Sequence, residues 1–265
     1  MPLEQIIVLA LVQGITEFLP ISSSGHLILI PAFTTWQDQG LITDVMVHVG
    51  SLAAIIVYFW RDVLAMLRGA VHILKRKWTR EAKLAAYVGA ATVPAVVFGL
   101  ILKETGILDR IRGIEVVAWN ALIFGVLLMV ADMHGVQKRT VDSITFRSAM
   151  IIGAAQALAL IPGTSRSGIT MTAARFLGFR RDEAARFSFV LGIPAIAGAG
   201  LLTTFDAMES GQGISSDAML AAALTFVSAF ASIVFLMAIV KRMSFFPFVL
   251  YRMLLAGFLL VMAYG

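Results

Sequence analysis

Six long apolar stretches dominate this sequence, and each approaches the roughly 17 to 25 residues that a helix needs to cross a bilayer. A chain with a mean hydropathy of +0.90 and 14% charged residues also has too little polar surface for a water-soluble globule of its size. We therefore expect an all-α integral membrane protein in which residues 1–265 form a single polytopic membrane domain. The six expected transmembrane helices are Val45–Trp60, Leu84–Leu102, Val116–Ala131, Phe187–Phe205, Ala218–Val240 and Phe248–Ala263.

Two further apolar regions are too short and too interrupted to cross the membrane alone. The first is broken by QGITEFLPISSSGH (Gln13 to His26), and the second is broken by IPGTSRSG (Ile161 to Gly168). A broken backbone at membrane depth is tolerated only where protein buries it or a wet cavity receives it. We therefore expect two re-entrant helical hairpins, each of which enters and leaves on one face of the membrane.

The two breaks resemble each other, which indicates an internal repeat. PISSSG at 20–25 matches PGTSRSG at 162–168 with one residue inserted, and a glutamine precedes each proline. Each half, repeat 1 at about 1–132 and repeat 2 at about 148–265, contains one hairpin followed by three spans. Because three is odd, the second half must be inverted relative to the first. This inverted-topology repeat brings the two hairpins together near the membrane midplane.

The distribution of charge predicts an orientation. If the segment Arg61–Lys83 is cytoplasmic, 16 of the 21 Lys and Arg residues fall on that face, whereas Lys103, Arg110 and Arg112 fall on the opposite face. This asymmetry agrees with the positive-inside rule and places both termini outside. The net charge of +5 therefore needs no nucleic-acid partner. The basic segment is typical of an amphipathic helix on the anionic inner leaflet, and a solvated connector is the alternative.

Two charges at membrane depth are candidates for function, because ionisable residues there are costly. Glu17 follows Gln13 by four residues and shares a helical face with it. Arg166 lies in the second break among the hydroxyls of Thr164, Ser165 and Ser167. The structural alternatives are a carboxylate wetted at a helix end and an arginine that snorkels to the cytoplasm.

The serines and glycine of each break are typical of the start of a helix, where hydroxyls cap free N–H groups and glycine admits a ligand. Simple capping is one interpretation. The other uses both breaks, because two helix N-termini that converge present N–H donors and positive dipole ends to an anion, and phosphate fits best. Arg166 can add bidentate contacts to phosphate oxygens.

His26 is the histidine with the most promising neighbours. It stands three residues after Ser23, so one helical turn places it beside a hydroxyl, where it can act as nucleophile, general base or general acid. A hydrogen-bonded packing role is the alternative. His48 has only Asp44 nearby at helical spacing and receives no role. A dinuclear metal cluster is not favoured, but Glu17 and substrate phosphates together can hold one divalent cation such as Mg²⁺.

The two motifs resemble the signatures of the undecaprenyl-diphosphate phosphatase family, also called the bacitracin-resistance BacA or UppP family. The resemblance extends to VHVGSLAAIIVYFWRDV (Val47 to Val63) and FPFVLYR (Phe246 to Arg252), and so covers essentially the whole chain. It implies a multi-pass enzyme of the bacterial inner membrane, with a site open to the periplasmic side. Such an enzyme hydrolyses a C55 polyprenyl diphosphate to the monophosphate carrier and phosphate, supports cell-wall synthesis and depends on Mg²⁺ or Ca²⁺.

The resemblance also assigns residues. Its acidic motif falls on Gln13 and Glu17, its serine-rich segment on Ser22, Ser23 and Ser24, its histidine on His26, and its arginine segment on Ser165 and Arg166 with Thr170 beyond. The expected catalytic residues are Glu17, Ser23, His26 and Arg166. The attacking group is either the Ser23 hydroxyl or a water molecule, activated by His26, and a direct attack by His26 stays open. The expected substrate contacts are Gln13, Ser22, Ser24, Gly25, Thr164, Ser165, Ser167, Gly168 and Thr170.

A lipid-phosphate transporter or flippase is the alternative function, because inverted repeats with broken helices also build carriers. A carrier needs no nucleophile, so the proximity of Ser23 and His26 favours the enzyme. The expected partners are a polyprenyl diphosphate and membrane lipids. The sequence leaves the oligomeric state open, with a homodimer as one alternative.

Overall fold

The structure, a computed structural model, describes residues 1–107, 111, 113–134, 137–209 and 213–265. These residues form helices, with one isolated β-bridge between Arg139 and Phe179. The helices are α1 (Leu3–Thr16), α2 (Ser23–Phe33), α3 (Leu41–Tyr58), α4 (Trp60–Leu74), α5 (Arg80–Thr105), α7 (Ile114–His134), α8 (Phe146–Ala157), α9 (Arg166–Phe176), α10 (Arg181–Glu209), α11 (Ser216–Ile239) and α12 (Phe246–Tyr264). Two short 3₁₀ helices, Val141–Ser143 and Leu158–Leu160, flank α8.

The six expected spans are confirmed as helices that are long and apolar enough to cross a membrane: α3, α5, α7, α10, α11 and α12. Helix α3 begins at Leu41 and α10 at Arg181, earlier than the apolar stretches suggested. The first turn of each helix contains an acidic residue, Asp44 in α3 and Asp182 in α10. A limit drawn from hydrophobicity alone misses such a turn, whereas backbone hydrogen bonding includes it.

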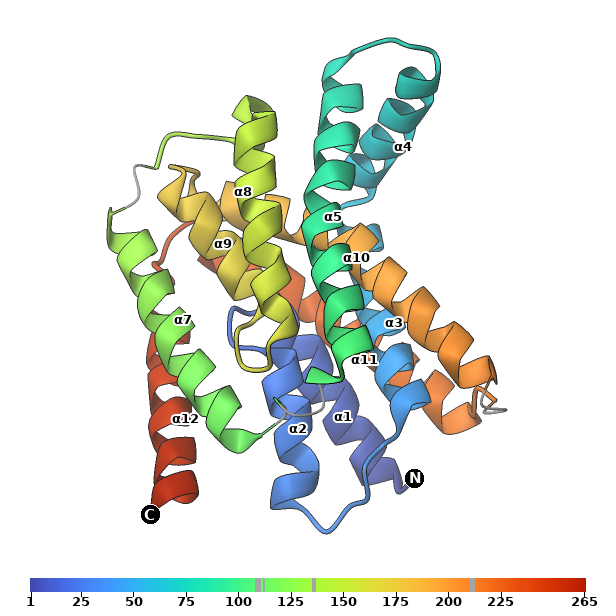
Figure 1. The fold of residues 1–265 in the computed structure, drawn as a ribbon, viewed down its shortest axis with the longest axis vertical. Helices are drawn as coiled ribbons and strands as arrows, with labels where there is room; N and C mark the ends of the chain where they lie inside the picture. The colour runs from blue at the N-terminus through green and yellow to red at the C-terminus, as the bar shows by residue number, and fades with distance from the viewer. Residues whose placement is uncertain (108–110, 112, 135–136, 210–212) are drawn as a thin grey trace.

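The two interrupted regions each form a pair of short helices. In the first, α1 ends before Pro20 and α2 begins at Ser23; in the second, the chain passes from α8 through a 3₁₀ turn and Pro162 before α9 begins at Arg166. Proline lacks an N–H and opposes continuation of a helix, and the serines that follow cap the next one. Figure 1 shows the connections of the two pairs turned toward each other in the middle of the molecule.

Corresponding helices of the two halves make corresponding contacts. Helix α1 packs against α11, and its counterpart α8 packs against α5. The remaining spans of the two halves meet in pairs, α3 with α10 and α7 with α12. The largest buried apolar cluster crosses this boundary, since it joins residues such as Phe18, Ile55, Phe189 and Phe248. The halves therefore share one core.

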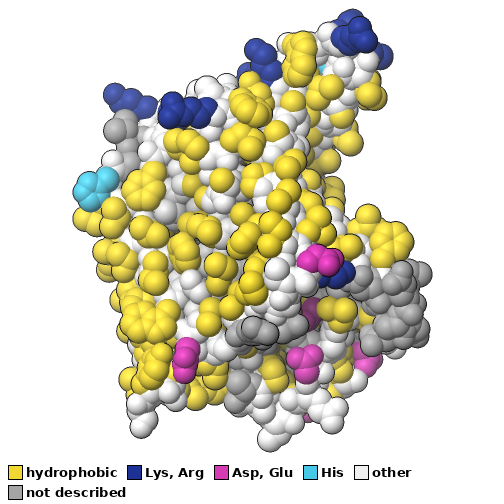
Figure 2. Space-filling view, in the orientation of Figure 1, with side chains coloured by type: hydrophobic (Ala, Val, Ile, Leu, Met, Phe, Trp, Pro, Cys, Tyr) yellow, Lys and Arg dark blue, Asp and Glu magenta, His cyan; other side chains and the backbone are white. Residues whose placement is uncertain are grey.

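The polar surface is divided between two ends. Figure 2 shows Lys and Arg side chains gathered at the end that carries the α4–α5 turn, whereas the visible Asp and Glu side chains lie toward the opposite end. Both termini lie at that opposite end (Figure 1). Arg110 and Arg112, which the charge analysis placed opposite the basic end, lie outside the described residues.

Helix α4 is amphipathic, as its sequence predicts. Its packing partner is α5, and Trp60, Leu64, Leu67 and Leu74 are exposed on its other side. The helix ends at Leu74, so the basic residues that follow lie in the turn before α5 rather than in the helix.

Candidate active site

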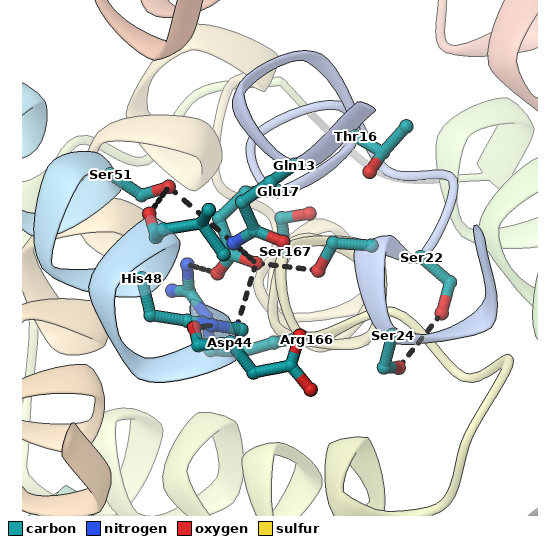
Figure 3. A network of polar contacts seen from close by, with 12 residues as sticks. Gln13, Thr16, Glu17, Ser22, Ser24, Asp44, His48, Ser51, Arg166 and Ser167 are labelled. Atoms are coloured by element: carbon teal, nitrogen blue, oxygen red, sulfur yellow. Dashed lines mark hydrogen bonds and ion pairs between the residues drawn. The ribbon is translucent and has the colours of Figure 1, made fainter. Parts of the chain in front are cut away.

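The two breaks touch each other directly. Ser167 Oγ in the second break donates to the backbone oxygen of Leu19 in the first at 3.1 Å. Arg166 Nη2 donates to Glu17 Oε1 at 2.9 Å and forms an ion pair with it. Residues 149 positions apart in the sequence thus form one polar cluster, to which α3 adds further side chains (Figure 3). The expected partner of Arg166 was a bound anion, whereas the structure pairs its guanidinium with the Glu17 carboxylate.

The helices that follow the breaks start in the same way. Ser22 is the N-cap of α2 and accepts a hydrogen bond from Gly25 N, while Ser165 is the N-cap of α9 and accepts one from Gly168 N. Both serines have a positive φ, 77° for Ser22 and 71° for Ser165, which is unusual for a residue with a side chain. The capping role predicted for these serines is confirmed.

These N-caps define the register between the two halves. The residue after each N-cap is Ser23 in one half and Arg166 in the other, so the two side chains that reach Glu17 from the helix starts occupy equivalent positions. Nine residues before each N-cap stands a glutamine. Five residues before Ser22 stands Glu17, but five before Ser165 stands Leu160. The carboxylate therefore belongs to only one half.

Four side chains surround the buried Glu17 carboxylate. Besides Arg166 at Oε1, Oε2 accepts from Ser23 Oγ at 2.5 Å and from Gln13 Nε2 at 3.2 Å. The fourth is His48, with its Nε2 3.9 Å from Oε2. Because burial of a lone carboxylate is costly, these partners explain how Glu17 is held there as an anion. A hydroxyl bonded to a carboxylate in this way can pass its proton to it.

The structure pairs His26 differently from the expectation. His26 Nδ1 lies 2.6 Å from the backbone oxygen of Ser22, and Nε2 lies 2.6 Å from the Tyr251 hydroxyl. Ser23 instead bonds to Glu17. The helical spacing places His26 one turn from Ser23, but the ring turns to α12 and stacks on Tyr251. Here Glu17 rather than His26 is the base within reach of the Ser23 hydroxyl.

The expected substrate-contact residues divide into two sets. Ser24 is exposed, and its Oγ lies 3.4 Å from that of Ser22. Ser167, Gly168 and Thr170 are buried, and Thr170 Oγ1 bonds to Arg166 O and Ser188 Oγ. Thr164 Oγ1 is buried without a hydrogen-bond partner among the described residues. Among the expected first-break contacts, Ser24 is thus open to a ligand, whereas Gln13, Ser22 and Gly25 are as buried as the groups of the second break.

Three site residues were missed by sequence reasoning. His48 and Arg252 are ionisable residues within predicted spans, and that criterion alone was enough to mark them. His48 reaches Glu17, as described above, and Arg252 contacts both breaks. Tyr251 had no signal in a single sequence, since only the fold brings it to His26.

The donor set beside Glu17 fits a hard divalent cation in part. No group of three His, Asp or Glu side chains with metal-binding geometry occurs among the described residues. However, Gln13 Oε1 is buried and lacks a hydrogen-bond partner, while Nε2 of the same amide and Ser23 Oγ both donate to the Glu17 carboxylate. Mg²⁺ typically takes one or two protein oxygens and completes its coordination with water and phosphate. These three residues fit such a shared site.

Changing the two N-cap serines tests the strained helix starts. We expect Ser22→Ala and Ser165→Ala to lose the cap and keep the unfavourable backbone, whereas Ser22→Gly and Ser165→Gly relieve it. The glycine variants should therefore be more stable than the alanine variants by about 1–2 kcal/mol, measured by thermal unfolding in detergent. Ser215, which caps α11 with φ −81°, is the matched control and should show a smaller preference for glycine. Equal preferences at the three sites would contradict the prediction.

Comparisons with known proteins agree with the resemblance. The sequence model of the family described as bacitracin resistance protein BacA matches residues 6–258. A protein of Jannaschia sp. named undecaprenyl-diphosphatase is 49% identical over 272 residues, and the alignment covers all of both chains. A protein of the same name from Erythrobacter litoralis is 47% identical, over 94% of this chain and 95% of its own. Rhodospirillum rubrum has a similar protein, undecaprenyl-diphosphatase 1, at 46% identity over 100% and 96%.

Proposed function

Because the chain belongs to the bacitracin resistance protein BacA family, we propose that it is an undecaprenyl-diphosphatase. It is an integral membrane hydrolase that converts undecaprenyl diphosphate to undecaprenyl phosphate and inorganic phosphate, and so returns the lipid carrier to cell-wall synthesis. The single observation that carries the assignment to a site is the cluster of Ser23 and Arg166 on one carboxylate, Glu17, at two joined helix starts.

The headgroup binds where the two breaks meet. The N-termini of α2 and α9 supply N–H donors and the positive ends of two helix dipoles, which favour a diphosphate. Arg166 is the partly exposed cation of the cluster, and its planar guanidinium suits two phosphate oxygens at once. The isoprenoid tail stays among the apolar spans. Thus the polar part of the substrate leaves the lipid while the tail does not.

The transfer step uses Ser23 and Glu17. Ser23 Oγ attacks the terminal phosphorus, its proton passes to Glu17, and the bond from that phosphorus to the bridging oxygen breaks as undecaprenyl phosphate leaves. Water then attacks the phosphoserine, releases phosphate and restores the Ser23 hydroxyl. The 2.5 Å bond from Ser23 Oγ to Glu17 Oε2 supports this order, and Arg166 stabilises the charge on the transferred group. In the alternative, water attacks directly and Ser23 only binds.

A divalent cation, Mg²⁺ or Ca²⁺, completes the proposal. Glu17 and Gln13 would hold it together with the diphosphate, and it would neutralise phosphate charge. We expect chelation with EDTA to abolish phosphate release by the purified protein, and added Mg²⁺ or Ca²⁺ to restore it. Full activity in EDTA, with thermal unfolding unchanged by either metal, would contradict a role for a cation.

The membrane topology is part of the same proposal. The helix pairs α1–α2 and α8–α9 are re-entrant hairpins, and the halves are an inverted repeat. Equivalent N-caps at Ser22 and Ser165 support this, as do the equivalent contacts of α1 with α11 and of α8 with α5. The site opens to the periplasmic side of the inner membrane. The basic end of the molecule, opposite the termini, supports that orientation (Figures 1 and 2).

The function itself is tested with purified protein and a polyprenyl diphosphate. Released phosphate is measured over time, and labelled lipid phosphate is followed between leaflets of reconstituted vesicles in parallel. Hydrolysis supports the phosphatase. Movement of lipid between leaflets without phosphate release would favour the transporter instead.

A further inference from the structure

Arg252 of α12 lies beside the two breaks but outside the cluster around Glu17. Its side chain is fully buried. Its guanidinium donates to five backbone oxygens at 3.0–3.2 Å, and these come from both breaks and from α7: Pro20, Gly163, Thr164, Asn120 and Ala121. An arginine has five N–H donors, so all of them are used.

These five bonds tie three separate segments to one rigid group. A single nitrogen, Nη1, donates to the backbone oxygens of both Pro20 and Thr164, although these belong to different breaks. The broken backbone leaves its carbonyl groups without helical partners, and such groups are costly when buried and unpaired. One guanidinium satisfies carbonyls on both sides, so its planar geometry sets how far apart the two breaks stand.

The backbone oxygens that Arg252 binds immediately precede the reacting groups in the chain. Pro20 O belongs to the turn that leads into Ser22 and Ser23, and Thr164 O belongs to the turn that leads into Arg166. A Cβ added at Gly168 would lie 3.1 Å from Arg252 Nη1, so the glycine allows the guanidinium to reach the first turn of α9. A shift of the guanidinium would therefore move Ser23 and Arg166 relative to each other.

We propose that Arg252 is a positioning residue of this site, which holds the two breaks at the separation at which Ser23 and Arg166 reach the same phosphoryl group. The inference rests on the proposed phosphatase function. It gives Arg252 a role that does not require contact with the substrate. Neutral carbonyls occupy all of its donors, so none remains for a phosphate oxygen.

Arg252→Lys is the central test. An ammonium group has three donors around one point and cannot bridge five carbonyls on three segments. We expect kcat for phosphate release to fall about 100-fold, while KM changes by less than about threefold, because the binding groups remain but are misaligned. A kcat within twofold of the unchanged protein, in a folded variant, would overturn the proposal.

Arg175→Lys is the matched control. Arg175 is an equally buried arginine near the other end of α9, where it bonds to Asp132 and to the backbone oxygen of Phe179. Its replacement should lower the melting temperature, as that of Arg252 should, but leave kcat within about twofold, because its partners Asp132 and Phe179 lie outside both breaks. An equal loss of kcat in both variants would mean that general packing, and not positioning, explains the effect.

A distance measurement separates this inference from the function on which it rests. The chain contains no cysteine, so spin labels can be placed on Leu11→Cys in α1 and Ile151→Cys in α8, both exposed positions. We expect the distance distribution to broaden in Arg252→Lys and to stay unchanged in Arg175→Lys. An unchanged distribution in Arg252→Lys overturns the positioning role. Failure of the unchanged protein to release phosphate overturns the proposed function, whatever the distances show.

Discussion

Replacing Arg166 with alanine should lower kcat/KM for phosphate release by about 10³- to 10⁵-fold, the loss found when an arginine that stabilises phosphoryl transfer is removed. Two effects combine. The transferred phosphoryl group loses its bidentate partner, and Glu17 loses its ion pair at 2.9 Å while it remains buried. Phosphate release is measured at saturating and limiting substrate, together with thermal unfolding in detergent to show that the variant is folded.

Two further variants test whether the loss is specific to the guanidinium of Arg166. Arg166→Lys keeps the charge but not the fork geometry, and it should recover only part of the activity. Arg186→Ala removes an arginine of α10 that pairs with Asp62 away from the breaks, and should leave phosphate release nearly unchanged. Full activity in Arg166→Ala would remove the anion contact from the site altogether.

Replacing Glu17 with glutamine should lower kcat by about 10²- to 10⁴-fold, the usual contribution of a general base. The amide preserves the size of the side chain but cannot accept the Ser23 proton. Because the same carboxylate also orients Arg166, the double variant Glu17→Gln with Arg166→Ala should be little worse than the more damaged single variant. Phosphate release at several pH values measures each kcat.

Glu183→Gln is the matched control for that series. Glu183 also accepts a hydrogen bond, from Val141 N, but it lies in the first turn of α10 away from Ser23. Its amide variant should retain activity. If Glu17→Gln keeps kcat within about threefold, or if the two losses multiply in the double variant, Glu17 is not the shared partner of Ser23 and Arg166.

Hydrophobicity and local capping signals predict much of this fold. The six spans, the two breaks at Pro20 and Pro162, and the serine-capped helix starts all follow from short-range patterns. The repeat predicted that the two breaks meet, and the cost of a charge at membrane depth marked Glu17 and Arg166 as candidates, but the ion pair between them was not predicted. Local patterns therefore predict the helices and their breaks, and the cost of a buried charge singles out candidate residues without giving their partners.

The orientation of individual side chains could not be predicted from the sequence. Helical spacing allowed His26 to face Ser23, but spacing fixes only the position of Cβ, and the ring turns instead toward Tyr251. Arg252 could have been marked as an ionisable residue within a predicted span, but its contacts could not be predicted. Its partners are backbone oxygens of segments about 90, 130 and 230 residues away, and backbone oxygens leave no trace in the residue types.

Leu160 stands where the second half would need a carboxylate to match Glu17. In the proposed repeat the second half therefore lacks this carboxylate, and among the more accessible polar groups Ser23, Ser24 and His26 belong to the first half and Arg166 to the second. In the proposed mechanism, the nucleophile and the base therefore both come from the first half. In the proposed topology, the direction in which the first hairpin enters the bilayer would decide which compartment receives the phosphate, and the same chain inserted upside down would deliver it to the other.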